Sequence, residues 1–210
     1  MKKSSSLVLM IVGAVVVFVL IVLGLGGCTT YNSMVTAEEN VDKTWADVQA
    51  SYQRRFDLIP NLVNAVKGYA DHESSTLENV TNARAGLIQK GDSLIATAKG
   101  LTAFNPNGDG PSVEQLEKLN RDMGIYINAV HEAYPDLKAS KNFENLQIQL
   151  EGTENRINTE RNRYNEAVNE YNVKIRRFPN NIFAGMFGFA RKNPFAATSE
   201  AQTAPTVNFN

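Results

Sequence analysis

The sequence has few of the residues that build metal centres and disulfides. Its 210 residues include one cysteine, Cys28, and two histidines, His72 and His131. A single cysteine cannot form an intrachain disulfide, so packing alone must stabilise the fold. Ferritin-like metal centres need Glu-x-x-His on two helices, whereas Tyr69 and Asn128 stand three residues before the two histidines. We therefore expect no metal site and no cofactor.

Signatures of catalysis and of nucleic-acid binding are also missing. The sequence contains no G-x-S-x-G elbow, no G-x-x-x-x-G-K-[ST] loop and no H-E-x-x-H pair. Its formal net charge is −1, whereas nucleic-acid binders usually carry a basic stripe. No strand-like alternation of apolar and polar residues is sustained. The sequence thus predicts an all-α protein that is not an enzyme and does not bind nucleic acid.

One long hydrophobic run stands near the amino terminus. Residues 7–25, LVLMIVGAVVVFVLIVLGL, contain no charged or polar side chain. At about 1.5 Å per residue this run spans about 28 Å as a helix, close to the roughly 30 Å hydrocarbon core of a bilayer. Lys2 and Lys3 precede the run, and residues 28–47 carry four carboxylates against one lysine. By the positive-inside rule, we expect a single membrane span with residues 29–210 on the non-cytoplasmic side.

Cys28 allows a second interpretation of the anchor. The sequence Leu25-Gly26-Gly27-Cys28 resembles the cleavage box of a bacterial lipoprotein, after which Cys28 would carry the lipid. The apolar run is longer than the about 7 to 15 residues of a usual signal-peptide core, which favours an uncleaved helix. In both interpretations residues 1–28 attach the chain to membrane lipid.

Apolar residues at alternating steps of four and three predict four helices after the anchor. The first covers residues 31–59, and the second begins near Pro60 and ends before Gly100, with Gly86 and Gly91 weakening its end. The third follows a capping box and covers residues 112–133, and the fourth covers residues 140–178.

Short connections between these helices indicate an antiparallel up-down four-helix bundle with coiled-coil-like packing over residues 29–195. Residues 101–111 are rich in Gly, Pro, Asn and Asp and predict a loop. The small and polar residues 196–210 predict a flexible tail.

In such a bundle the fourth helix returns toward the membrane, and the residues after it come to lie near Tyr31. These residues include Phe183, Phe187 and Phe189, and basic residues flank them on both sides. The pattern is typical of a segment that lies on a lipid surface. The alternative is that the phenylalanines cover the membrane-side end of the bundle core.

Several charged residues fall on the helix stripes that should face the core. They are Glu38 and Arg55 in the first helix and Glu73 and Arg84 in the second. Because an unpaired buried charge is costly, we expect core ion pairs, with Glu38 close to Arg84. The alternative is a metal-dependent enzyme that uses carboxylates such as Glu38 and Glu73.

The dipeptide Tyr-Asn occurs twice on the fourth helix at a spacing of seven residues. The first pair is Tyr164-Asn165 and the second is Tyr171-Asn172. Tyrosines at this spacing usually lie in a core with a hydrogen-bonded hydroxyl, which is what we expect here.

The residues from about 31 to 195 resemble the LemA family of bacterial membrane proteins. The resemblance lies in motifs that occur in order along the chain: YNxMV from Tyr31, Trp45, QRRFDLIPNLV from Gln53, VKGYA from Val66, ARA from Ala83, EAYPxLKA from Glu132, GTENRI from Gly152, YNxxVxxYN from Tyr164, and FP at Phe178. It implies a membrane-anchored helical bundle without agreed catalytic residues. It also suggests as partner a membrane-bound zinc peptidase or an exported domain of the TPM type.

We therefore expect a non-enzymatic scaffold or interaction module, tethered at the cell envelope, that presents one face to another protein or to a second copy of itself. The alternatives are the metal-dependent enzyme described above and an accessory subunit of an envelope protease or transporter.

Overall fold

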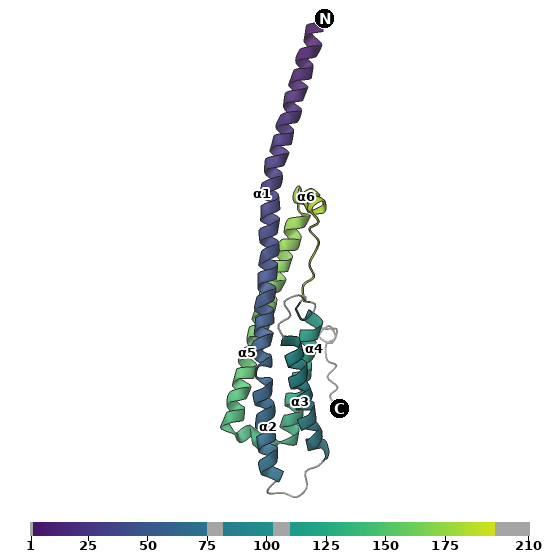
Figure 1. Cartoon of the computed structure of the whole chain (residues 1–210). Helices are drawn as coiled ribbons and strands as arrows, with labels where there is room; N and C mark the ends of the chain where they lie inside the picture. Colours follow the sequence, from purple (N-terminus) through teal and green to yellow (C-terminus); the bar gives the residue numbers. More distant parts are fainter. Residues whose placement is uncertain (1, 75–81, 103–109, 196–210) are drawn as a thin grey trace, which may run out of the picture. The chain divides into compact units, whose positions relative to one another are not determined.

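The computed structural model describes residues 2–74, 82–102 and 110–195, and over these ranges the protein is all-α without strands. This confirms that the protein is all-α, whereas the antiparallel four-helix bundle stays a prediction. Figure 1 labels the elements, which are α1 (Lys2–Phe56), α2 (Ile59–Ser74), α3 (Asn82–Thr102), α4 (Val113–Ala133), a short 3-10 helix η1 (Pro135–Ala139), α5 (Lys141–Arg176) and α6 (Asn180–Phe187). No helix that is both long enough and apolar enough for a membrane span was found in the part of the chain that the structure describes.

The chain divides into two compact units, which are described separately. Unit 1 consists of Met1–Thr44 and Arg163–Asn210, and unit 2 consists of Trp45–Asn162. The long helices α1 and α5 each contribute residues to both units.

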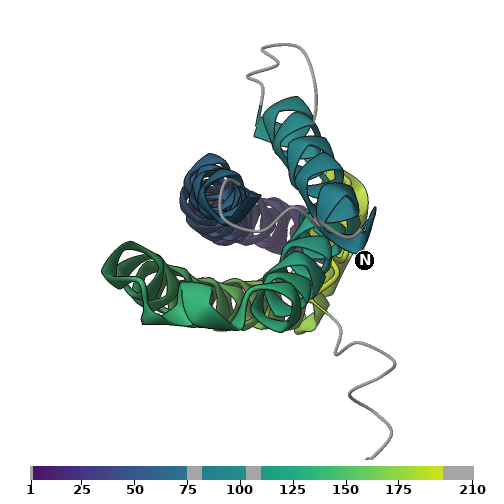
Figure 2. The same ribbon diagram turned by 90° about the horizontal axis from the view of Figure 1, so that it is seen from below.

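The core of unit 2 gathers apolar side chains from all of its helices. In this unit α3 packs against both α2 and α4, which are blue to teal in the view from below (Figure 2). The buried side chains mostly recur at helical steps of three and four residues and include Val48, Tyr52, Phe56, Ile59, Leu62, Val66, Leu116, Leu119, Met123, Tyr126, Val130, Tyr134 and Phe143. Burial of these apolar surfaces is the main source of stability in a chain without disulfides.

The predicted second helix is two helices in the structure. α2 ends at Ser74, and α3 runs from Asn82 through Gly100 to Thr102, so the expected end before Gly100 is wrong. Gly91 lies inside α3, where an added Cβ would be 2.8 Å from the Tyr126 hydroxyl and 2.9 Å from Cγ2 of Val63. Glycine at this position lets α3 approach its neighbours closely, and this packing outweighs its poor helix propensity.

A local signal places the start of α4, whereas the end of α5 differs from the prediction. The Ser112 hydroxyl accepts a hydrogen bond from the Gln115 amide at 3.2 Å, and the Gln115 side chain accepts one from the Ser112 amide at 2.9 Å. This is the predicted capping box. α5 ends at Arg176, so the expectation that its apolar stripe extends to Phe178 is wrong. The Phe178 side chain is 81% exposed.

Unit 1 contains the amino-terminal part of α1, the carboxyl-terminal part of α5, and α6. Its core includes Met34, Val41, Val168 and Tyr171, which are almost fully buried. After α6 the chain reverses at Gly188, whose φ of 80° is left-handed and suits glycine. Residues 188–195, which we call the C-terminal strap, then run back along α5 without helix or strand (Figure 1). Residues 101–102 belong to α3, and the rest of the predicted loop up to residue 109 and the predicted tail 196–210 lie outside the described residues.

Candidate functional site

Two asparagines of α5 hold the C-terminal strap by its main chain. Nδ2 of Asn172 donates to the Lys192 carbonyl at 2.8 Å, and Oδ1 of Asn172 accepts from the Lys192 amide at 3.1 Å. Asn165 binds the main chain of Phe195 in the same way, at 3.5 Å and 2.8 Å. Each amide side chain thus satisfies both polar groups of one strap residue.

The two tyrosines of the Tyr-Asn pairs bind the same segment. The hydroxyl of Tyr171 donates to the Ala190 carbonyl at 2.9 Å, and that of Tyr164 donates to the Asn193 carbonyl at 3.2 Å. Both rings are buried, as expected for core tyrosines with hydrogen-bonded hydroxyls. Burial raises the pKa of both phenols, and for Tyr171 the neighbouring Glu38 carboxylate raises it further.

The spacing of the Tyr-Asn pairs matches the geometry of the strap. Seven residues of a helix advance by about 10.5 Å, and three residues of extended chain advance by about 10 Å. From Asn165 to Asn172 the bound strap residue changes from Phe195 to Lys192, which is a step of three. The Tyr-Asn repeat therefore sets the register of the C-terminal strap along α5. The sequence alone did not reveal which segment the repeat binds.

Lys192 connects the C-terminal strap to α1. Its Nζ lies 2.6 Å from Oδ1 of Asp42 and 3.4 Å from Oε1 of Glu38, and it also lies 5.8 Å from the centre of the Tyr171 ring. Burial lowers the pKa of Lys192, but the hydrogen bond and charge of Asp42 outweigh burial, so the pKa is raised. The ammonium group is thus charged at neutral pH and joins the strap, α1 and α5.

The predicted ion-pair residues have different surroundings. Arg55 is buried, with Nη1 2.8 Å from Oε2 of Glu154 and 2.9 Å from the Leu150 carbonyl. Burial lowers the Arg55 pKa, and the Glu154 carboxylate opposes this shift. Glu38 lies beside Lys192, as described above. The side chains of Glu73 and Arg84 lie outside the described residues, so the pairing of Glu38 with Arg84 stays a prediction.

The phenylalanines predicted to contact the membrane gather against α1. The Tyr31 ring centre is 4.9 Å from that of Phe187 and 5.7 Å from that of Phe189. Phe183 stacks on Phe187, and its Cε1 would lie 3.1 Å from a Cβ added to Gly27. The segment after α5 therefore lies beside Tyr31, where the sequence placed it. Cys28, in α1 next to Gly27, is exposed with a free thiol.

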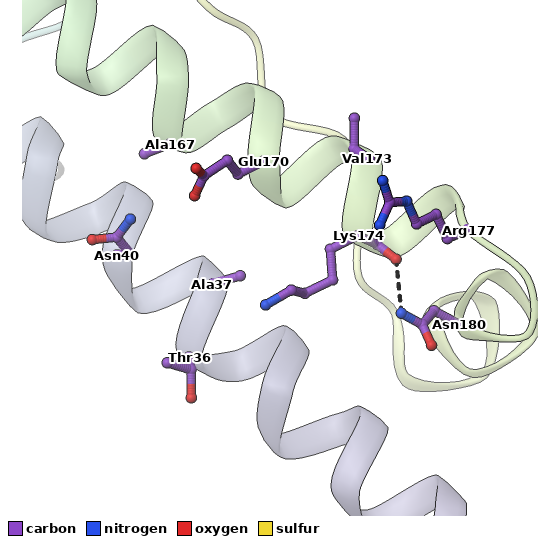
Figure 3. A pocket seen from close by; sticks show the side chains of 9 residues that line it. All are labelled: Thr36, Ala37, Asn40, Ala167, Glu170, Val173, Lys174, Arg177 and Asn180. Atoms are coloured by element: carbon purple, nitrogen blue, oxygen red, sulfur yellow. Dashed lines mark hydrogen bonds between the residues drawn. The ribbon is translucent and has the colours of Figure 1, made fainter.

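A groove of about 590 Å³ runs between α1 and α5 in unit 1 (Figure 3). Its lining combines small apolar side chains with amides and charges, namely Thr36, Ala37, Asn40, Ala167, Glu170, Val173, Lys174, Arg177 and Asn180. The Lys174 side chain crosses toward α1, where its Nζ donates to the Ser33 carbonyl at 3.2 Å. At the α6 end, Nδ2 of Asn180 donates to the Lys174 carbonyl at 3.1 Å.

The groove combines charged, amide and small apolar groups. The nine lining residues include neither histidine, cysteine nor serine, and their titratable groups are one carboxylate and two cations. Over the described side chains, no cluster of three or more His, Cys, Asp or Glu is close enough to hold a metal ion.

Comparison with known proteins places these features in a family. The two proteins named magnetosome protein MamQ 1 and MamQ 2 of Paramagnetospirillum magneticum strain AMB-1 are each 26% identical to the chain over 187 residues. Magnetosome protein MamQ of Magnetospirillum gryphiswaldense strain MSR-1 is 25% identical over 174 residues. Each match covers 79% of this chain and 64% of the relative, so the chain spans slightly less than two thirds of the relatives' length. The family model of the LemA family matches residues 44–209. The chain therefore belongs to the LemA family.

Proposed function

We propose that the protein is a non-enzymatic scaffold that is tethered to the membrane by residues 7–25 and binds another envelope protein in the groove of unit 1. The observation that carries the proposal is the continuity of α1 from Lys2 to Phe56. The helix that contains the uncharged run 7–25 also supplies Thr36, Ala37 and Asn40 to the groove. A partner bound there is held at a fixed distance from the anchor.

The hydrogen bonds of unit 1 support a rigid binding surface. The C-terminal strap, α1 and α5 are joined through Lys192 and through the two Tyr-Asn pairs. Such preorganisation reduces the entropy that is lost when a partner binds. The partner class that family resemblance suggests is a membrane peptidase or a TPM-type domain, and a second copy of the chain is the alternative occupant. The relatives are named as magnetosome proteins, which supports a role within a larger assembly.

Photo-crosslinking in intact cells tests the proposal. A photoreactive amino acid at Val173 lies in the groove on a side chain that is 39% exposed, and one at Ile148 lies on α5 in unit 2 at 61% exposure. We expect the full chain in the membrane fraction and one defined adduct from position 173, which the charge reversal Lys174→Glu abolishes. No such adduct is expected from position 148.

Two results would contradict this function. One is recovery of the intact full chain in the soluble fraction, and the other is an equal yield of adducts from positions 173 and 148. An adduct of twice the mass of the chain would identify the partner as a second copy. Reporter fusions at Asn210 test the proposed non-cytoplasmic side. Mass spectrometry of the mature protein separates the two forms of the anchor, because cleavage leaves a lipid-modified Cys28 as the first residue.

A further inference from the structure

α6 exposes an apolar face that no described side chain of unit 1 covers. On this helix Ile182 is 55% exposed and Met186 is 67% exposed, and a separation of four residues puts both on one side. Phe187 is 47% exposed at the edge of the same face, and Phe178 just before α6 is 81% exposed. Four large apolar side chains in one short segment form a patch of the kind that marks an interaction site.

The opposite side of α6 is packed against the rest of unit 1. Ala184 is buried, and Phe183 lies against Gly27 of α1. The phenylalanines that the sequence singled out therefore differ in role. Phe183 and Phe189 mainly attach the segment to α1, whereas Ile182 and Met186 face away from it.

The segment that carries this face contains cations and no carboxylate, although one of its cations, Lys192, is paired with Glu38 and Asp42 of α1. Residues 171–195 contain Lys174, Arg176, Arg177, Arg191 and Lys192 and no Asp or Glu. Arg176 and Arg191, which flank the segment on both sides, are exposed. An apolar face bordered by cations complements an anionic lipid surface, in which acyl chains lie below negative headgroups.

The position of α6 along α1 matches the depth of the headgroups. Gly27 lies two residues after the end of the run 7–25, or about 3 Å along a helix, and Tyr31 lies about 9 Å along. The interfacial region of a bilayer extends about 5–7 Å beyond each side of the hydrocarbon core. Because α6 contacts α1 at Gly27 and Tyr31, it extends from the level of the headgroups to just beyond them when residues 7–25 span the bilayer.

We propose that the exposed face of α6, formed by Phe178, Ile182, Met186 and Phe187, docks on the anionic lipid surface next to the anchor. The proposal rests on the membrane tether of the proposed function. α6 then forms a second point of contact with the bilayer beside the anchor. Two contact points fix the tilt of α1 relative to the bilayer, whereas an anchor helix alone does not.

Tryptophan fluorescence in vesicles tests this docking. The full chain carries Trp45→Phe together with Met186→Trp and is reconstituted into vesicles of phosphatidylcholine with phosphatidylglycerol. The lipids carry bromine on the acyl chain, either near the headgroup or near the bilayer centre. We expect bromine near the headgroup to remove about half of the emission, and bromine near the centre to remove less, because the side chain lies in the interface.

Matched variants separate docking from general effects. Ile182→Trp, on the same face, is expected to behave as Met186→Trp does, and it keeps the test valid if one substitution disturbs folding. Ile148→Trp in unit 2 is expected to show no quenching. Replacing Arg176 and Arg191 by Gln is expected to remove the increase in quenching that phosphatidylglycerol causes.

The outcomes are distinguishable from failure of the tether. A chain that does not float with the vesicles overturns both the tether and the docking. A chain that floats while the Met186→Trp and Ile182→Trp variants both stay unquenched overturns the docking alone and leaves the tether in place. Blue-shifted but unquenched emission with crosslinks between Met186→Cys chains also overturns the docking, because it shows that a second copy covers the face.

Discussion

Asn172 exchanges two hydrogen bonds with the main chain of Lys192, at 2.8 Å and 3.1 Å. We expect Asn172→Ala to lower the free energy of unfolding by about 1–3 kcal/mol, because two main-chain groups of the C-terminal strap lose their partner. We also expect the C-terminal strap near Lys192 to detach from α5, which exposes its main chain more than the loss of global stability does. Limited digestion of the full chain with trypsin, followed at the bonds after Arg191 and Lys192, measures that detachment.

Asn169→Ala is the matched control for this prediction. Asn169 is exposed on the same helix, so its replacement changes helix propensity similarly and leaves the strap bound. Equal digestion rates for the two variants would show that the hydrogen bonds of Asn172 do not hold the strap.

The close approach of α3 to its neighbours depends on Gly91. We expect Gly91→Ala to lower the free energy of unfolding by about 1–3 kcal/mol, because the new methyl group overpacks against Val63 and the Tyr126 hydroxyl. Gly86 is also in α3, but it is exposed, and none of the described residues places an atom within 4 Å of an added Cβ. Gly86→Ala is therefore expected to raise stability by about 0.5–1 kcal/mol. Urea titrations of the full chain in detergent compare the two, and a stabilising Gly91→Ala would contradict the packing described above.

The pair Arg55–Glu154, in which the cation is buried, is expected to contribute more than a pair whose cation is exposed. Arg55→Ala leaves the Leu150 carbonyl and a partly exposed Glu154 without their cation, which we expect to cost about 2 kcal/mol. A double-mutant cycle with Glu154→Ala is expected to give a coupling energy of about 1 kcal/mol.

The pair Lys118–Asp122 on α4 serves as the comparison for this cycle, because its side chains are 69% and 38% exposed. Its coupling is expected to be about 0.3–0.5 kcal/mol and to vanish in concentrated salt. If both cycles gave the same coupling energy and the same salt dependence, burial of Arg55 would have no special effect.

Tyr126 is expected to make the free energy of unfolding depend on pH in the alkaline range. Burial raises the pKa of its phenol to about 12, and its hydroxyl has no hydrogen-bond partner among the described residues. In the unfolded state the phenol has a pKa near 10 and therefore loses its proton at a lower pH than in the folded state. The stability that this difference in pKa contributes is complete below about pH 10 and is lost as pH rises toward 12. At pH 11 the loss is expected to be about 1.4 kcal/mol. Urea titrations at pH 8 and pH 11 measure it, and Tyr126→Phe is expected to reduce the difference by that amount.

Elements with local signals could be predicted from the sequence. The side chains of Ser112 and Gln115 form a capping box over only three residues, so the start of α4 needs no knowledge of the rest of the fold. Val48 and Tyr52 are apolar residues four positions apart in the first predicted helix, and both side chains are buried, as helix periodicity predicts.

Features that depend on a distant neighbour could not be predicted in the same way. Gly91 has low helix propensity, yet it lies in the middle of α3 because Val63 and Tyr126 leave no room for a larger residue. Phe178 continues the spacing of the α5 stripe, but α5 ends at Arg176 and the ring is exposed. The periodicity of apolar residues therefore does not show at which residue a helix ends.

The C-terminal strap is the clearest case of a missed element in the candidate site. The Tyr-Asn repeat was visible in the sequence, but its partners are carbonyl and amide groups, which every residue of the chain carries. Main-chain groups leave no pattern in a sequence. A repeat of polar residues on a helix therefore indicates that something is bound there without identifying the segment.

Attachment through the main chain also determines how the strap can diverge among relatives. Ala190 and Asn193 are bound only through their carbonyl oxygens in the contacts described above, so replacement of their side chains leaves the attachment intact. Lys192 and Phe195 also contact the helices of unit 1 through their side chains, with Asp42 of α1 and with the Tyr164 ring of α5. Substitutions are therefore expected to accumulate quickly at positions 190 and 193 and slowly at Asn165 and Asn172. The Tyr-Asn pairs of α5 can bind straps of quite different composition.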